Sequence, residues 1–149
     1  MPIKFYKIKE PFGAFSNFSR HTFKLDGYTW KTTEHYFQAQ KYVNTVRFEM
    51  IANAATPREA AELGRDRSIP LRKDWESIKD DVMRKCVLAK FSTYPELKAL
   101  LLGTGDEEII EDSHIDSYWG CGSSGTGKNM LGKILMETRE ILRKQMAVH

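Results

Sequence analysis

Residues 30–42 read W-K-T-T-E-H-Y-F-Q-A-Q-K-Y, and the rest of the chain is organised around them. Thr32 or Thr33 is suited to begin a helix, because a threonine hydroxyl accepts a hydrogen bond from a backbone N–H in the first turn. The run continues without Gly or Pro to Ala55, which predicts one long helix. The spacing expected of its core-facing side is found at Tyr36, Ala39, Val43, Val46 and Met50.

A second stripe on this predicted helix is polar. Glu34, Gln38 and Lys41 follow the i, i+4, i+7 spacing that places side chains on one side of a helix. Such a stripe is most often a solvated surface. Here, however, Phe37 and Tyr42 project on either side of it, which is more typical of a pocket floor. The three polar residues are therefore candidate site residues.

Composition limits the class of protein. The 149 residues are 41% hydrophobic and carry a net charge of +3, which suits one soluble domain over residues 1–149 with a sizeable core. Only Cys86 and Cys121 are present, with no signal-like N-terminus and no long apolar run, so we expect a cytoplasmic protein with reduced thiols. The four histidines lack the spacing of metal ligands, and neither a metal nor a cofactor is expected.

The N-terminal thirty residues carry strand signals. Asp26-Gly27 lies between the alternating segments 22–25 and 28–30, and this pair is a strong β-hairpin signal. Residues 3–8 also alternate well enough for a short strand. We expect these segments to form one small sheet that leads into the long helix.

A short loop places two polar residues between two rings. Ser16 and Asn17 lie between Phe15 and Phe18, so the rings could anchor the loop while the polar pair faces a ligand. The alternative is that Ser16 and Asn17 bond to their own backbone, as loop Ser and Asn residues commonly do.

Residues 56–59, Thr-Pro-Arg-Glu, begin a short helix that should end near Gly64. Arg65 and Arg67 follow it in a loop, where two guanidinium groups are suited to clamp phosphate oxygens. The alternative is that Asp66 and the carbonyl groups of the preceding helix satisfy both arginines.

A glycine-rich segment precedes the last predicted helix. Gly122 to Lys128 matches G-x-x-x-x-G-K, but Asn129 stands where a nucleotide-binding P-loop needs Ser or Thr, and no buried strand precedes it. A P-loop is therefore disfavoured. A glycine-rich turn before a helix still offers backbone N–H groups and a positive dipole to an anion, with Lys128 alongside.

These residues together favour one kind of chemistry. Glu34 and Asp116 are isolated carboxylates, and Tyr118 and Trp119 are aromatic platforms, as is Trp75 unless it belongs to the core. Such a set suits cleavage of a glycosidic bond to a phosphorylated ribose. A carboxylate can stabilise the oxocarbenium-like transition state or activate water, while rings hold the leaving base.

The sequence resembles the NADAR family, also called YbiA-like N-glycosidases, over nearly its whole length. The matching segments are F-S-N-F at 15–18, T-x-E-H-Y-F-Q-A-Q-K at 32–41, G-R-D-R-S at 64–68, P-L-R-K-x-W at 70–75, Y-W-G at 118–120 and G-K-N-x-L-G at 127–132. The resemblance implies a compact, mainly helical α+β domain with a small N-terminal β-hairpin or sheet.

The resemblance also implies hydrolysis of an N-glycosidic bond on a ribose that carries phosphate or ADP. The leading expectation is removal of ADP-ribose from ADP-ribosylated guanine, in single-stranded nucleic acid or a nucleotide. An alternative is hydrolysis of phosphoribosylamino-pyrimidine intermediates of riboflavin biosynthesis. Riboflavin-linked members have Glu-Asn where this chain has His114-Ile115, which disfavours that substrate. A non-catalytic ADP-ribose-binding module is a third interpretation, and no membrane partner is expected.

Carried over by residue, the resemblance makes Glu34 and Asp116 acid/base candidates. Lys41 is a third catalytic candidate, since an amine beside a carboxylate in a partly dry pocket could attack C1′ of an opened ribose and form a Schiff base. From the motifs and the residue chemistry together, the candidate substrate-binding residues are Ser16, Asn17, Gln38, Arg65, Arg67, Trp75, Tyr118, Trp119, Gly120, Lys128 and Asn129.

Overall fold

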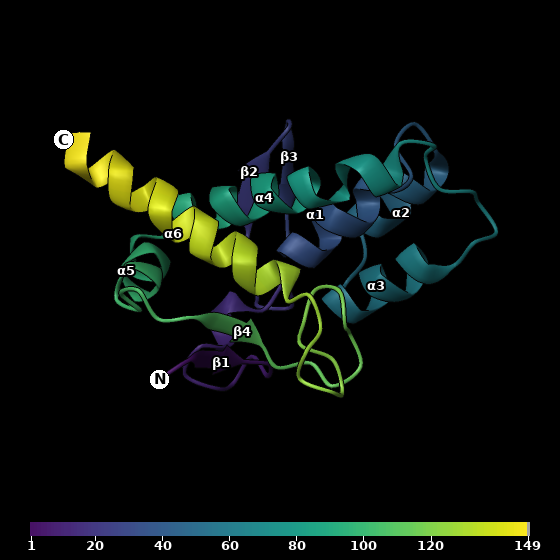
Figure 1. The fold of residues 1–149 in the computed structure, drawn as a ribbon. Helices are drawn as coiled ribbons and strands as arrows, with labels where there is room; N and C mark the ends of the chain where they lie inside the picture. Colours follow the sequence, from purple (N-terminus) through teal and green to yellow (C-terminus); the bar gives the residue numbers. More distant parts are fainter. Residues whose placement is uncertain (149) are drawn as a thin grey trace. The chain divides into compact units, whose positions relative to one another are not determined.

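The computed structural model describes residues 1–148 and shows a mainly helical α+β fold, which confirms the predicted class (Figure 1). The helices are α1 (Thr33–Gln40), α2 (Val46–Ala52), α3 (Pro57–Arg65), α4 (Trp75–Thr93), α5 (Pro95–Leu102) and α6 (Met130–Val148), with a 3₁₀ turn, η1, at Gly13–Phe15. The strands are β1 (Ile3–Phe5), β2 (Phe23–Leu25), β3 (Tyr28–Trp30) and β4 (Ile109–Glu111).

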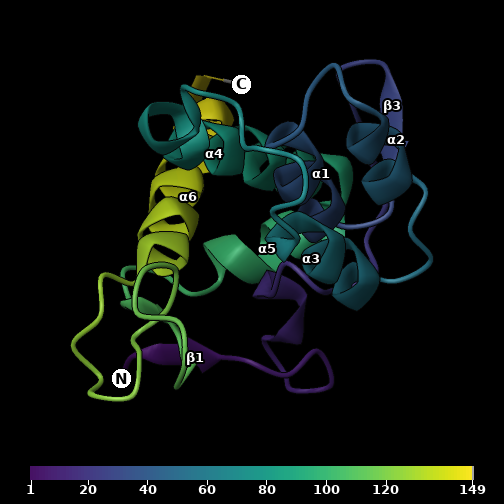
Figure 2. The ribbon, with the colours of Figure 1, turned by 90° about the vertical axis from the view of Figure 1, so that its right-hand side faces the viewer.

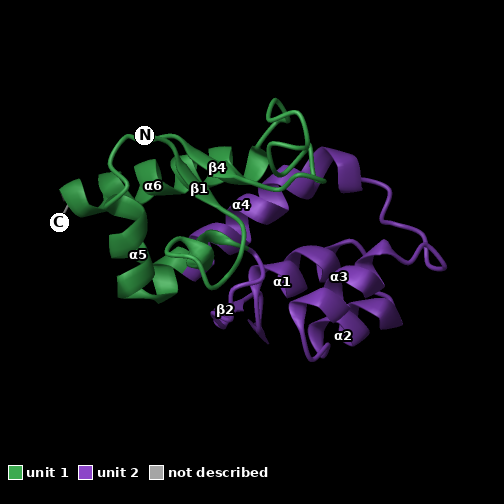
Figure 3. Ribbon diagram, turned by 90° about the horizontal axis from the view of Figure 1, so that it is seen from below, with its two compact units in different colours: residues 1–16, 91–149 green, residues 17–90 purple. Residues whose placement is uncertain are grey.

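The chain separates into two compact units (Figure 3). The central unit is Asn17–Lys90, and the terminal unit combines Met1–Ser16 with Phe91–His149. The single domain expected over residues 1–149 stays a prediction. Among residues 1–148, no helix combines the length and the apolar character that a membrane crossing requires.

The predicted hairpin is confirmed in the central unit. β2 and β3 pair antiparallel with Phe23 opposite Trp30, joined by Asp26 and Gly27 at φ 55° and 81°. Positive φ at both turn residues is the requirement of a type I′ turn, which Asp-Gly meets at low cost. The hairpin delivers a fully buried Trp30 next to the start of α1.

The predicted long helix is wrong beyond Gln40. The chain turns at residues 41–45 and begins α2 only at Val46. Asn44 has φ 62°, a left-handed conformation that an α-helix cannot contain. Val46 and Met50, predicted to face the core, are 69% and 46% exposed. The break rotates α2 relative to α1, so the helical periodicity could not be extended across it.

Helices α2 and α3 pack against α1 in the central unit (Figure 2). The predicted start of α3 is confirmed, because the Thr56 hydroxyl accepts a hydrogen bond of 3.1 Å from the Glu59 N–H. Ile51 of α2 and Ala60 of α3 are fully buried. Small and branched side chains at this junction let the three short helices approach closely.

In the terminal unit, β1 pairs in parallel with β4, with Ile3 beside Ile109 and Phe5 beside Glu111. The prediction of one sheet over the first thirty residues is therefore wrong, because β1 finds its partner about a hundred residues away. Helix α6 packs on β4, and α5 packs on α6. Phe15 contacts Phe5 at a ring-centroid distance of 5.9 Å and Phe91 at 5.8 Å, forming an aromatic core.

Candidate active site

The first turn of α1 is held by the loop that precedes the hairpin. The predicted cap is confirmed at Thr32, whose hydroxyl accepts from the His35 N–H at 3.1 Å. The Asn17 carbonyl accepts from the Glu34 N–H at 3.2 Å, and the Asn17 side-chain oxygen accepts from the Thr33 hydroxyl at 2.7 Å. The buried Asn17 therefore fixes the backbone that carries Glu34.

The polar stripe of α1 is buried rather than solvated. Glu34, Gln38 and Lys41 are all buried, on a helix that is covered on nearly every side. Gln38 Nε2 donates to Glu34 Oε2 over 2.7 Å, which holds one carboxylate oxygen. Gln38 Oε1 is buried without a hydrogen-bond partner in residues 1–148. A buried polar atom in that state is costly unless a ligand or water satisfies it.

Lys41 lies between two aromatic rings. Its Nζ is 5.6 Å from the Phe37 ring centroid and 5.9 Å from that of Trp75, and the residue is 8% exposed. Within residues 1–148 this amine has no hydrogen bond and no carboxylate in ion-pair range. Phe37 and Trp75 meet edge to face at 5.0 Å. Trp75 is thus buried as a wall of the Lys41 environment.

The charges near Lys41 are mostly positive. Its pKa falls from an ordinary 10.5 to about 8, chiefly because the amine is buried and then because Arg67 lies nearby. Arg65 and Lys79 also lower this pKa, while the Glu34 carboxylate raises it. A partly dry amine with a lowered pKa and a carboxylate in its neighbourhood is the environment of a reactive lysine. The surrounding cations also favour an anionic ligand.

The two candidate arginines differ in how they are held. Arg65 is the last residue of α3 rather than part of a loop as predicted, and only Arg67 lies in the loop that follows. Arg67 donates from one terminal nitrogen to the Gly64 carbonyl at 2.6 Å and to the Tyr42 hydroxyl at 3.0 Å. Arg67 therefore has a helix-carbonyl partner at one terminal nitrogen, and its role as a phosphate clamp stays a prediction. Asp66 pairs with Arg47 instead of either loop arginine. Arg65 is exposed, and its side chain makes no hydrogen bond or ion pair with residues 1–148.

Another group of candidates lies in the terminal unit. Asp116 Oδ1 accepts from the backbone N–H groups of Tyr118 at 3.0 Å and Trp119 at 2.8 Å. The carboxylate thus stabilises a turn of the backbone at residues 116–119. The Tyr118 and Trp119 rings meet edge to face, with their centroids 4.9 Å apart. Lys128 Nζ lies 5.4 Å from the Tyr118 centroid, a cation–π distance.

The backbone N–H groups that lead into α6 are already bonded within the chain. The N–H groups of residues 127–131 all donate to backbone carbonyls of residues 117–121, at 2.7–3.0 Å. These N–H groups therefore join residues 127–131 to residues 117–121 and are not available to an anion. Gly127 permits this close approach, because a Cβ there would lie 2.7 Å from the Ser117 carbonyl oxygen. Lys128 stays a candidate for an anion in this segment.

Three further candidates have evident structural roles. Asn129 Nδ2 donates to the Ile109 carbonyl at 2.8 Å, and its Oδ1 accepts from the Glu111 N–H at 2.9 Å, so its side chain pairs with β4. Gly120 is buried so closely that a Cβ would lie 2.9 Å from the Glu111 carbonyl oxygen. Ser16 is buried and closes η1 through its N–H.

Sequence reasoning missed several residues that shape the site. Arg47 of α2 was not a candidate, and no sequence signal marked it. Lys79, whose charge lowers the pKa of Lys41, was not a candidate either. Gly64 was interpreted only as a helix stop, but the Gln38 carboxamide packs against it where a Cβ would be.

Comparisons with known proteins agree with the resemblance in the motifs. The family model described as NADAR domain matches residues 4–143. The chain is 51% identical over 140 residues to N-glycosidase YbiA of Escherichia coli (strain K12), covering 94% of this chain and 88% of that protein. It is 45% identical to the Zea mays riboflavin biosynthesis protein PYRR, chloroplastic, covering 94% of this chain but 25% of that protein. The NMR structure of E. coli YbiA superposes with a TM-score of 0.92 at 50% identity, covering 99% of this chain and 88% of that one.

Proposed function

This chain belongs to the NADAR family, and from that premise we propose that it removes ADP-ribose from ADP-ribosylated guanine in single-stranded DNA or a nucleotide. The relatives show the general class of reaction: the chain is an N-glycosidase, which is a hydrolase acting on N-glycosyl compounds. In the reaction, water is consumed, the bond between C1′ of the ribose and a nitrogen of the base is broken, and the base leaves with a proton.

One observation carries the proposal, the environment of Lys41. A buried amine without a partner in residues 1–148 lies beside two rings, with Glu34 near enough to raise its pKa and three cations near enough to lower it. Opposite charges thus surround the position where a phosphorylated sugar would react. The rings supply a stacking surface, and Arg65, Arg67 and Lys79 favour phosphate.

The same geometry supports two routes. In the first, Glu34 activates water or stabilises positive charge at C1′. In the second, Lys41 Nζ bonds to C1′ of the opened ribose and the base departs with a proton managed by Glu34. Water then hydrolyses the C1′ imine, which regenerates the amine and releases ADP-ribose. Asp116, in the terminal unit, is the other acid/base candidate.

The first experiment measures base release from a single-stranded DNA oligonucleotide bearing ADP-ribosyl-guanine. Wild type is expected to release ADP-ribose, and Glu34→Gln to fold normally and release none. Glu62→Gln, at an exposed glutamate of α3 that pairs with Arg58 at 3.8 Å, is the matched control and should keep full activity. Equal release by wild type and Glu34→Gln would remove Glu34 from the mechanism.

The two routes are separated by borohydride reduction during turnover. An imine on Lys41 would be trapped as a covalent adduct in wild type but absent from Lys41→Arg, which keeps the charge but not the nucleophile. Full turnover by Lys41→Arg would exclude the Schiff-base route and leave the water route.

The alternative substrate class is the phosphoribosylamino-pyrimidine intermediates of riboflavin biosynthesis. It is supported by the name of the maize relative, whose matching region covers nearly all of this chain. The same residues would act, so substrate choice alone distinguishes the two. Release of base only from the pyrimidine intermediates would replace the leading proposal with this one. The names of the relatives favour catalysis over a non-catalytic binding module.

A further inference from the structure

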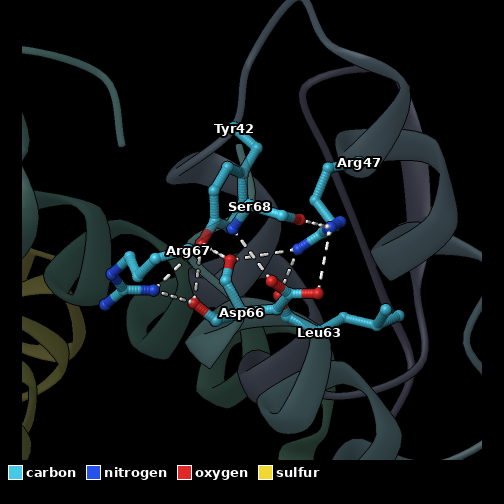
Figure 4. A network of polar contacts seen from close by, with 7 residues as sticks. Tyr42, Arg47, Leu63, Asp66, Arg67 and Ser68 are labelled. Atoms are coloured by element: carbon cyan, nitrogen blue, oxygen red, sulfur yellow. Dashed lines mark hydrogen bonds and ion pairs between the residues drawn. The ribbon is translucent and has the colours of Figure 1, made fainter. Parts of the chain in front are cut away.

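The loop that carries Arg67 is held by a buried arginine from α2. Arg47 is 6% exposed, and its terminal nitrogens donate to four acceptors in the last turn of α3 and in the loop that follows (Figure 4). These are the Leu63 carbonyl at 2.9 Å, the Asp66 carbonyl at 3.2 Å, Asp66 Oδ2 at 3.3 Å and the Ser68 hydroxyl at 3.0 Å. One guanidinium group therefore sets the backbone path of residues 63–68.

The Asp66 carboxylate completes this arrangement. Its Oδ1 accepts from the Ser68 N–H at 2.9 Å while Oδ2 faces Arg47. Hydrogen bonds from Ser68 lower the pKa of Asp66, and Arg47 adds to the effect, so the carboxylate stays charged opposite the arginine. The terminal nitrogens of this buried arginine are satisfied by the four contacts, whereas its Nε is buried without a partner in residues 1–148. A change in the loop path would leave further buried donors unsatisfied and would therefore be costly.

Tyr42 connects this loop to Arg67. Its hydroxyl is 2.8 Å from the Gly64 carbonyl and 3.0 Å from the Asp66 carbonyl, and it accepts from Arg67 at 3.0 Å. The Arg47 guanidinium covers the Tyr42 ring at 5.5 Å from its centroid. Arg67 is thus bound through one terminal nitrogen, and its other nitrogens have no partner in residues 1–148. Figure 4 shows the Arg67 guanidinium extending away from the Arg47 side of the network.

We propose that Tyr42 and Arg47 are positioning residues that preorganise the Arg67 guanidinium to bind a phosphate group of the substrate. The proposal rests on the proposed function for the identity of a phosphorylated substrate. Because one edge of Arg67 is already fixed, the opposite edge is presented without the loss of rotamer freedom that an unrestrained arginine would undergo. Arg65 lacks such anchors, so Arg67 is the preorganised member of the pair.

The experiment uses inorganic pyrophosphate as the probe, with its affinity measured by calorimetry for the full chain. Arg67→Ala should weaken binding by roughly tenfold or more, the effect of losing a charge-assisted hydrogen bond. Tyr42→Phe, which removes one oxygen atom and keeps the ring, should weaken binding by roughly threefold to tenfold. In the Arg67→Ala background, Tyr42→Phe should have no further effect.

Two variants separate positioning from general structure. Tyr36→Phe is the matched control, because Tyr36 is a buried tyrosine of α1 in the same unit and its hydroxyl donates to Asp26 at 2.8 Å, away from the loop. It should leave pyrophosphate affinity unchanged. Arg47→Lys keeps the charge but cannot reach four acceptors, so it should weaken pyrophosphate binding as Tyr42→Phe does.

The outcomes are distinct from those that test the glycosidase. If Tyr42→Phe weakens binding equally with and without Arg67, its role is merely structural and the positioning proposal is overturned. Absence of pyrophosphate binding by wild type, or an affinity that Arg67→Ala leaves unchanged, also overturns it, even if base release is observed. Coupled losses of affinity in a protein that releases no base would support positioning and contradict the proposed reaction.

Discussion

The side-chain amide of Gln38 donates to the Glu34 carboxylate over 2.7 Å, one turn apart on α1. Its other end lies against Gly64 of α3, at the place that a side chain there would occupy. A glycine on one helix thus leaves room for the amide that orients a candidate catalytic carboxylate on another. This link places Gly64 in the architecture of the site, although it bears no chemistry itself.

Gly64→Ala is expected to destabilise the protein by about 1–3 kcal/mol, because the added methyl group overlaps the Gln38 carboxamide. Thermal or urea unfolding measures the loss. In a Gln38→Ala background only the Cβ of residue 38 stays close, at 3.1 Å, so the same substitution should cost less. A cost that is equal in both backgrounds would show that Gln38 is not what Gly64 accommodates.

The pH dependence of catalysis should report on Lys41 if its neutral amine reacts. We expect kcat/KM to rise with pH through an apparent pKa near the value of about 8 given by burial and Arg67. Removing a nearby cation makes protonation of Lys41 easier. Arg67→Gln should therefore raise the pKa of Lys41 and move the rise in kcat/KM to higher pH.

Arg58→Gln is the control for that profile, since Arg58 is exposed on α3 and pairs with Glu62. In Arg58→Gln, kcat/KM should rise at the same pH as in wild type. If Arg67→Gln does not shift this rise, a group other than Lys41 controls the profile.

Lys41→Met is expected to raise stability, and under the Schiff-base route it also abolishes activity. The pKa of Lys41 is lowered on folding, so the folded state resists the proton that the unfolded chain binds. Both states are neutral above pH of about 10.5. As the pH falls toward about 8, only the unfolded chain gains the proton and wild type loses stability. Below that, both states are protonated and the loss is constant.

The gain in free energy of unfolding for Lys41→Met should therefore reach a plateau on the order of 2 kcal/mol at neutral pH. Each pKa unit corresponds to about 1.4 kcal/mol, and the total is reduced because water partly reaches the amine. Urea unfolding at several pH values measures it. Lys24→Met, at an exposed lysine of β2, should show a difference that does not change with pH. A gain that is independent of pH at Lys41 would contradict the predicted protonation behaviour.

Asn129→Ala is expected to lower stability by about 2–4 kcal/mol, because two hydrogen bonds to β4 are lost at a backbone of φ 53°. Asn44→Ala is the matched control, an exposed asparagine at φ 62° with no side-chain hydrogen bond to residues 1–148. This substitution should lower the free energy of unfolding by about 1 kcal/mol, because alanine is strained in the left-handed conformation. Similar losses at both positions would mean that the β4 contacts contribute little.

The features that sequence predicted correctly are local. Asp26-Gly27 dictates its turn through backbone conformations that these two residues tolerate, and Thr32 and Thr56 cap helices within one turn of themselves. The motifs likewise identified the NADAR family, which the family match to residues 4–143 confirms. The roles of the individual candidate residues stay predictions.

The features that sequence missed depend on partners far along the chain. Nothing local to residues 33–55 showed that helix α1 would stop at Gln40, nor that β1 would pair with β4. The sequence likewise did not show that the N–H groups of residues 127–131 would bond to carbonyls of residues 117–121.

Lys41 shows the same division at a single side chain. Its residue type and its place beside Glu34 were evident in the sequence, and both made it a candidate nucleophile. Its lowered pKa arises from burial between Phe37 and Trp75 and from the charge of Arg67, which Tyr42 anchors. Local sequence sets which backbone conformations and which chemical groups are present, because those depend on near neighbours. Burial, charge environment and hydrogen-bond partners arise only when distant segments pack together.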